Sequence, residues 1–183
     1  MLTLRSIVAR ASLALMLTVS LAADLPAQQL PPDSVFARLA GRWVLQGTIA
    51  RKATTHDVTF DWLLGHSYLQ MHEVSREKGA DGRAAYEAIV LFGRDPKSGQ
   101  YACVWLDNTG TSAFDPAGTG RGFVAGDSLP FFFDYSGSTS FHTTFVYQRA
   151  TDTWQWHMDN DSAGVRRPFA RVTLTRATRP GKR

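Results

Sequence analysis

Apolar and polar residues alternate with a period of two along most of the chain from Gly41 onward. In the first such segment, Trp43, Leu45, Gly47 and Ile49 fall on one face of an extended backbone. This period is typical of β-strands, because successive side chains of a strand point to opposite faces of the sheet. The pattern therefore predicts an all-β chain.

Turn-forming residues divide this pattern into about ten strands. We expect turns at residues 64–66, 79–82, 95–99 and 107–110, where Gly, Asp, Asn and Pro gather. The expected strands cover residues 42–50, 58–62, the stretch from the first turn through 74, 84–92, 101–106, 112–114, 122–124, 129–133, 141–147, 154–158 and 169–174. One short helix is expected over residues 35–39, after the breaking and capping residues at 31–34.

The short connections favour an antiparallel sheet, since parallel strands need long crossover segments. Ten strands would leave two open edges unless the sheet closes on itself. We therefore predict an antiparallel up-and-down barrel, somewhat wider than the eight-stranded barrels that hold one small ligand. Residues 28–176 would form this single domain.

The N-terminal segment has the composition of a secretion signal. Arg5 and Arg10 precede an apolar run over residues 11–23, and no acid occurs in the first ten residues. This run is too short for a spanning helix, which needs roughly 20 residues. We predict a signal peptide over residues 1–27, cleaved after Ala22 or Ala27, and an exported periplasmic or secreted protein without stable membrane insertion.

Composition and charge narrow the function classes. The chain of 183 residues is 44% hydrophobic with a formal net charge of +4, and several of its cations follow Asp161. Residues 177–183 are therefore expected to form a basic disordered tail. The body has no basic stripe, so no nucleic-acid partner is expected. The single cysteine, Cys103, excludes an internal disulfide and is expected to be a buried apolar residue.

Two groups of residues resemble known families. The segment 39–43, with Gly41 and Trp43 at the start of the first strand, resembles the Gly-x-Trp opening of lipocalin-like (calycin) barrels. Residues 86–95, 99–101 and 105–107 resemble the middle strands of the bacterial DUF1579 family of unknown function. The resemblance implies a ten-stranded barrel with a pocket for a hydrophobic ligand, and it implies no catalytic residues.

Common catalytic motifs are missing from the sequence. There is no Gly-x-Ser-x-Gly, no phosphate-binding Walker motif and no His-Glu-x-x-His. A carboxylate pair drawn from Asp107, Asp134 and Asp159 stays open, because the spacing places no two of them together. The sequence favours a binding role over an enzymatic one.

Two polar segments have simple structural interpretations. The glycine-rich residues 118–122 are expected to form a hairpin rather than a phosphate loop. Residues 159–161, Asp-Asn-Asp, lack the remaining ligands of a calcium loop and are expected to form a turn.

The histidines are the main candidates for cofactor chemistry. On an extended strand His66, Tyr68 and His72 share one face, but His66 and His72 are about 20 Å apart and cannot share a metal. Nitrobindin-type barrels also open with Gly-x-Trp and hold haem through a histidine near their C-terminal strands. The last strand here has none, although His142 or His157 could substitute. We expect no metal and no cofactor, with haem as the alternative.

Aromatic residues supply the remaining candidate site. The ligand pocket is expected to include the following residues: Trp43, Tyr68, His72, Tyr86, Trp105, Phe145 and Trp156. Such side chains offer apolar area, and Tyr and Trp add a polar group that can orient a guest. We predict a carrier of a small hydrophobic or amphipathic molecule. The alternatives are a haem- or metal-bearing barrel and a cell-envelope interaction module whose interior is filled by its own side chains.

Overall fold

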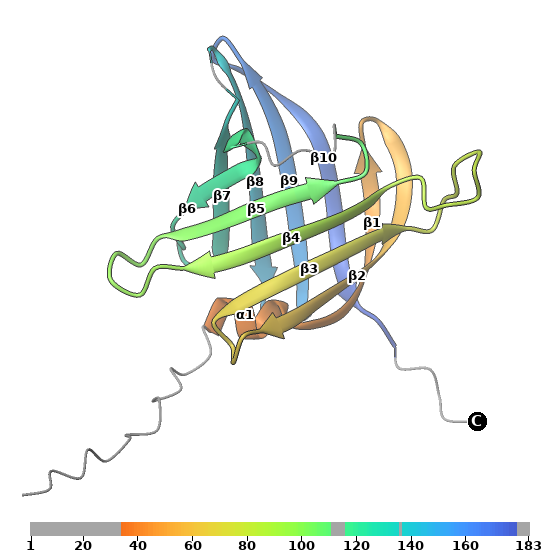
Figure 1. The fold of residues 1–183 in the computed structure, drawn as a ribbon. Helices are drawn as coiled ribbons and strands as arrows, with labels where there is room; N and C mark the ends of the chain where they lie inside the picture. The colour runs from red at the N-terminus through yellow and green to blue at the C-terminus, as the bar shows by residue number, and fades with distance from the viewer. Residues whose placement is uncertain (1–33, 111–115, 136, 179–183) are drawn as a thin grey trace, which may run out of the picture.

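The computed structural model describes residues 34–110, 116–135 and 137–178. Within these residues, ten strands form one closed antiparallel barrel (Figure 1). The strands are β1 (Gly41–Ile49), β2 (Lys52–Leu63), β3 (Tyr68–Ser75), β4 (Glu87–Arg94), β5 (Tyr101–Asp107), β6 (Thr119–Gly122), β7 (Ser128–Asp134), β8 (Thr139–Gln148), β9 (Thr153–Ser162) and β10 (Val165–Arg176). The predicted all-β antiparallel barrel with a short helix is confirmed.

Each strand pairs with its neighbours in sequence, and β1 closes the barrel by pairing with β10. The closing register places Leu45 opposite Leu174 and Gly47 opposite Val172. Closure removes the two free edges that an open sheet of the same described strands would have. The expected signal peptide, the expected strand at 112–114 and residues 179–183 lie outside the described residues.

One end of the barrel is closed by α1 (Ser34–Leu39), which lies beneath the strands in Figure 1. Its Phe36 ring packs edge-on against Trp62 of β2 and Tyr101 of β5, with centroids 6.1 and 5.2 Å apart. Leu39 is fully buried, and its carbonyl accepts a hydrogen bond from Trp43 Nε1 at 2.6 Å. This contact fixes the helix to the start of β1.

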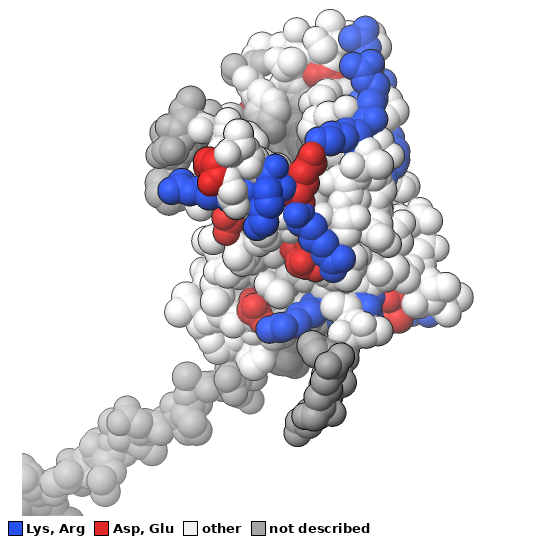
Figure 2. Space-filling model, turned by 90° about the vertical axis from the view of Figure 1, so that its right-hand side faces the viewer, with Lys and Arg blue, Asp and Glu red and all other residues white. Residues whose placement is uncertain are grey.

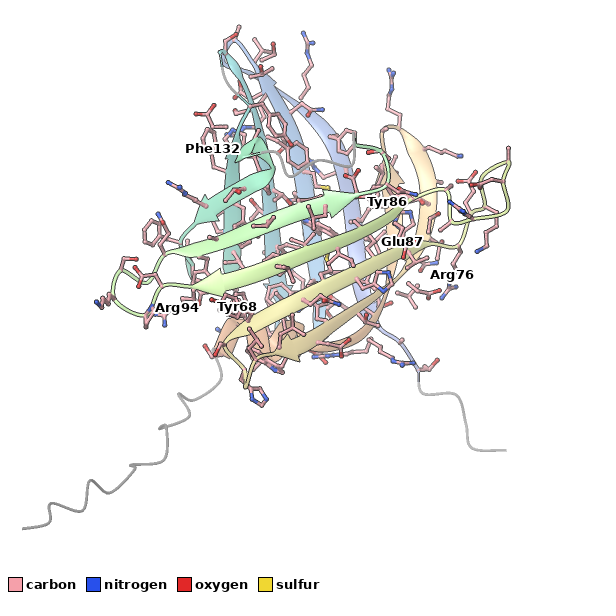
Figure 3. The ribbon with its side chains drawn as sticks, in the orientation of Figure 1. Tyr68, Arg76, Tyr86, Glu87, Arg94 and Phe132 are labelled. Carbon is pink, nitrogen blue, oxygen red and sulfur yellow. The ribbon has the colours of Figure 1, made fainter. Side chains whose placement is uncertain are left out.

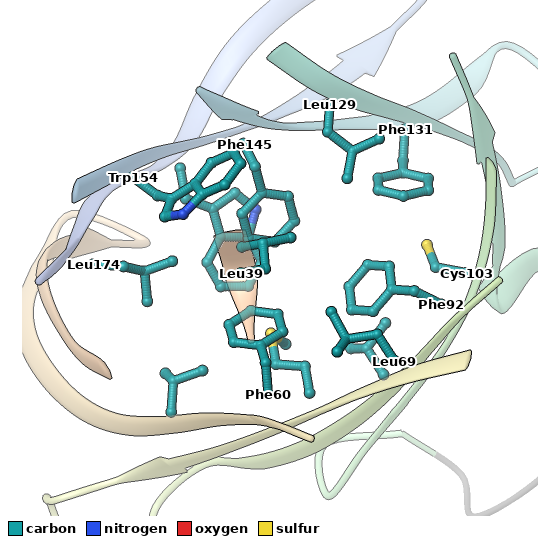
Figure 4. Packing of buried hydrophobic residues seen from close by; sticks show 14 of the residues in the cluster. Leu39, Phe60, Leu69, Phe92, Cys103, Leu129, Phe131, Phe145, Trp154 and Leu174 are labelled. Atoms are coloured by element: carbon teal, nitrogen blue, oxygen red, sulfur yellow. The ribbon is translucent and has the colours of Figure 1, made fainter. Parts of the chain in front are cut away.

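The interior next to α1 is filled by the barrel's own side chains (Figure 4). Phe145 of β8 stacks on Trp156 of β9 with ring centroids 4.4 Å apart, and Phe92 of β4 meets Phe131 of β7 at 5.6 Å. Cys103 is buried beside them, and burial raises the pKa of its thiol to about 12. This half of the barrel is a packed core.

The glycine-rich segment 118–122 was expected to form a hairpin, and this prediction was wrong. Its residues from Thr119 to Gly122 form strand β6 instead. Gly122 pairs with Tyr101 of β5, and a Cβ at Gly122 would lie 1.7 Å from the carbonyl oxygen of Pro130. Glycine is therefore required because β7 approaches closely here. A glycine that permits close contact between strands has the same sequence signature as a turn.

Residues 159–161 are also not a turn, and this expectation was wrong. They continue β9 as far as Ser162, and the chain reverses at Ala163 and Gly164, which both have positive φ angles. Asp159 is held by Arg171 of β10, whose Nη2 lies 2.5 Å from its Oδ1. The neighbouring strand supplies the partner that keeps a turn-prone sequence extended.

Charged side chains of both signs are interspersed over the face shown in Figure 2. Lys52 pairs with Glu77 at 2.6 Å, and Arg76 pairs with Asp57 at 2.6 Å. Across the described part of the chain, no helix has the length and apolar character needed to span a membrane.

Candidate functional site

A cavity of about 830 Å³ occupies the end of the barrel opposite α1. It is lined by the last residues of β1, β3 and β5 and by the first residues of β2 and β8. The helix α1 contacts the opposite ends of β2 and β5. Its volume falls within the usual range for small-molecule sites. The barrel is therefore filled at one end and hollow at the other.

The inward-facing residues change from apolar to polar along the barrel axis. On β2 the inward series runs from Phe60 and Val58 at the filled end to His56 and Thr54 at the cavity. On β3 the series starts with Leu69 and Met71 and then continues into Glu73 and Ser75. The same strand period thus builds both the core and a polar layer at the cavity floor.

The floor is centred on a buried pair formed by His56 and Glu73. These side chains are 3% and 1% exposed, and Nδ1 of His56 lies 2.5 Å from Oε1 of Glu73. His56 Nε2 lies 2.7 Å from Thr54 Oγ1, so both ring nitrogens have partners. Glu73 Oε2 is buried and has no hydrogen-bond partner among the described residues.

Burial is the main influence on the titration of this floor. It raises the pKa of Glu73, although the hydrogen bond and positive potential from His56 oppose the rise. Burial also raises the pKa of Tyr86, and the negative charges of Glu73 and Asp107 raise it further. The Tyr86 phenol therefore stays neutral and can donate a hydrogen bond at any physiological pH.

An aromatic wall stands above the polar floor. The Tyr86 ring stacks on His56 with centroids 5.7 Å apart, and Trp105 Nε1 donates to Tyr86 Oη at 3.2 Å. Trp105 meets Phe133 edge-on at 6.4 Å, and Phe133 meets Phe141 at 6.0 Å. These contacts join aromatic residues of several strands into one continuous surface facing the cavity.

Tyr86 and Trp105 are the expected pocket residues that line this cavity. Figure 3 shows Tyr86 where β4 begins, next to Glu87, and Tyr68 at the opposite end of the barrel, nearer α1. Tyr68 is 47% exposed, and its ring lies against Gly93. His72 is also on the outer face, where it bonds to Glu87 at 2.8 Å.

The other three expected residues, Trp43, Phe145 and Trp156, are buried in the packed core rather than at the cavity. Alternation correctly placed them inside the barrel, but it carries no information on position along the barrel axis. On β3, the face that holds His72 was expected to point inward, whereas Leu69, Met71 and Glu73 point inward instead.

Thr54 and Glu73 are functional candidates that sequence reasoning missed, while His56 and Asp107 were weighed for cofactor or carboxylate chemistry but were not placed in the predicted pocket. Their signal is a polar residue at an inward position of a strand that is otherwise apolar on that face, as His56 is after Val58 and Phe60. For Glu73 the signal appears only when the inward face of β3 is known.

The histidines offer no free nitrogen to a haem in the cavity. His56 is the histidine that lines it, and both of its ring nitrogens are engaged. His142 lies away from it, beside Arg166 at 3.1 Å, and His157 is on the outer side of β9 between Trp156 and Met158. Over residues 34–110, 116–135 and 137–178, no three His, Cys, Asp or Glu side chains gather closely enough to hold a metal ion. The described residues therefore do not fit a haem in this cavity.

Comparison with known proteins supports the fold. The structure is similar to that of Rv2717c from M. tuberculosis, with a TM-score of 0.50 and 14% sequence identity over 81% of this chain and 100% of that one. A redesigned β-barrel gives a TM-score of 0.38 and 12% identity over 79% of this chain and 96% of the other. No protein-family model and no curated protein matches the sequence. At these identities the Rv2717c likeness establishes a shared barrel fold.

Proposed function

We propose that this protein is an exported calycin-like barrel, of the type that the DUF1579 resemblance suggests, which binds a small hydrophobic or amphipathic molecule. The observation that carries the proposal is the cavity of about 830 Å³, lined by aromatic side chains over a polar floor, at the unfilled end of the barrel. Apolar burial supplies affinity at about 25 cal/mol per Å², less the cost of association.

The polar floor explains why the guest would be amphipathic. A filled barrel would need no inward His or Glu, because burying such groups costs free energy unless they have partners. Here Thr54, His56, Glu73 and Tyr86 meet the cavity from adjacent segments. A guest with one polar end would bond to this floor while its apolar body contacts the aromatic wall.

The binding test uses tryptophan fluorescence. An apolar probe titrated into the mature protein should change the emission of Trp105, which lines the cavity, and Trp105→Phe should remove most of that change. Trp154→Phe is the matched control, because Trp154 is fully buried and does not line the cavity. Native mass spectrometry of the untagged exported protein should show a bound small molecule. If the titration shows no saturable binding and mass spectrometry shows no bound molecule, the carrier proposal is rejected and an envelope interaction module is favoured.

Export is tested separately by N-terminal sequencing. Protein recovered from the periplasm or medium should begin at Ala23 or Gln28, the residues that follow the two expected cleavage positions. Recovery of the uncleaved chain in the cytoplasmic fraction would reject export.

A further inference from the structure

We infer that the cavity selects an organic cation joined to an apolar body, such as a protonated or quaternary alkylamine, because its floor is acidic and its wall is aromatic. The inference rests on the proposed binding function and specifies the chemical class of the guest. It is carried by the charges that line the cavity, by the unpartnered oxygen of Glu73 and by the aromatic surface.

The charged side chains around the cavity do not balance. Lys52 and Glu77 lie at its rim and neutralise one another at 2.6 Å. Glu73 and Asp107 remain: Glu73 is bonded through Oε1 to His56, and Asp107 has no Lys or Arg partner among the described residues. A carboxylate guest would therefore be repelled, whereas a cation would be attracted.

The Asp107 carboxylate is held in a fixed orientation at the cavity by the turn that follows β5. Its Oδ1 accepts hydrogen bonds from the backbone N–H groups of Thr109 and Gly110, at 2.8 and 3.1 Å, and from Thr109 Oγ1 at 2.6 Å. After burial, which is the main cause, the negative charge of Asp107 also contributes to raising the pKa of Glu73 and of Tyr86.

Glu73 gives a second and independent indication. Its side chain is 1% exposed and faces the cavity, and its Oε2 has no hydrogen-bond partner within the described chain. A buried acceptor without a partner is unfavourable, and more so when it is charged. A cation in the cavity would interact with this carboxyl group through the low-dielectric interior more strongly than a neutral guest, and an anionic guest would be repelled.

The aromatic wall suits the same guest. Trp105 and Tyr86 lie beside the acidic floor, and Phe133, Phe141 and Phe169 continue the wall, with Phe141 and Phe169 meeting at 5.9 Å. The faces of aromatic rings carry negative potential and attract alkylammonium groups, and the same rings provide apolar area for an alkyl chain.

The test compares three probes with the same tail: octyltrimethylammonium, octanol and octanoate, each titrated by calorimetry at neutral pH and low salt. We expect the cation to bind at least about tenfold more tightly than the alcohol, a difference of about 1.4 kcal/mol, and octanoate to bind most weakly. Equal affinities, or tightest binding of octanoate, would overturn the inference while leaving the carrier proposal intact. Failure of all three probes and of the apolar fluorescent probe would reject the carrier itself.

Charge-neutral variants locate the selectivity. Asp107→Asn keeps an acceptor for its turn and should reduce the preference for the cation over octanol severalfold, with little change in octanol affinity. Asp61→Asn on β2 is the matched control, since Asp61 is exposed and does not line the cavity. Glu73→Gln provides a second variant should Asp107→Asn fold poorly. A cation preference that survives in both cavity variants would contradict the inference.

Discussion

His56 of β2 and Glu73 of β3 form a hydrogen-bonded pair, with Nδ1 and Oε1 2.5 Å apart, where the inward residues of the barrel change from apolar to polar. Breaking a buried pair of this kind leaves an uncompensated polar group, so the pair constrains which substitutions the floor tolerates. It also makes the stability of the protein depend on pH in a defined direction.

Glu73→Gln should stabilise the protein increasingly as the pH rises. Because burial raises the folded-state pKa of Glu73 above its usual 4.5, its contribution to stability is fully present below that value and is lost as pH rises through the folded pKa. The glutamine amide does not titrate, so its contribution to stability stays constant over the same pH range. The melting temperature of Glu73→Gln relative to the parent should therefore rise between pH 4 and pH 8.

The control for this experiment is Glu87→Gln, which alters a histidine-bonded glutamate on the outer face of β4. Both partners there are substantially exposed, so solvent screens the interaction and a small effect is expected. Parallel pH curves for the parent and Glu73→Gln would show that Glu73 is not desolvated in solution.

Arg176 should contribute to barrel closure through its contact with Trp43. Its guanidinium carbon lies 3.8 Å from the Trp43 ring centroid, and Nη1 and Nη2 donate to the carbonyls of Ala40 and Arg38 at 2.7 and 2.9 Å. Arg176→Lys keeps the charge but loses the fork of donors, and it should lower the free energy of unfolding by about 1–2 kcal/mol. Urea denaturation measures the loss.

Arg83→Lys is the corresponding control, because Arg83 lies in an exposed turn and its ion pair with Asp81 spans 3.8 Å. It should leave the urea midpoint unchanged. An Arg176→Lys midpoint equal to that of the parent would show that the contact at the closing strands is not energetically important.

Gly47→Ala should disrupt the pairing of β1 with β10. A Cβ at this position would lie 2.3 Å from the carbonyl oxygen of Arg171, and the backbone φ of +150° is one that side chains rarely adopt. We expect a loss of about 3 kcal/mol or more, or failure to fold. Gly82→Ala tests the φ effect alone, since Gly82 has φ +78° and open space around it, and it should cost about 1 kcal/mol. Equal losses in the two variants would contradict the steric argument.

Phe145→Ala should show that the α1 end of the barrel is a true core. The ring is fully buried and stacks on Trp156, so truncation should cost about 3–5 kcal/mol. Phe132 lies on the outer face of β7 and is 46% exposed. Its replacement in Phe132→Ala should therefore change the free energy of unfolding by about 0.5 kcal/mol or less. Thermal and urea unfolding of both variants would measure the contrast, and a small loss for Phe145→Ala would indicate a loosely packed interior.

The barrel itself was predictable, because strand period and turn chemistry are local properties. The turns at 79–82 and 95–99 occur where expected, closed by hydrogen bonds from Gly82 N to the Gly79 carbonyl and from Gly99 N to the Asp95 carbonyl. Local sequence predicted turns wrongly at Gly122 and at residues 159–161, where contact with a neighbouring strand keeps the backbone extended. In both places the deciding contact comes from a different strand.

By itself the sequence determined an antiparallel all-β chain, its turns and the burial of aromatic residues such as Trp43 and Trp156, because these follow from alternation along each strand. Only the tertiary structure decided which end of the barrel is filled, which face of β3 points inward, and that His56 meets Glu73 beneath Tyr86. Those properties depend on register between strands and on the position of α1, and both arise when separate strands pack around a shared interior.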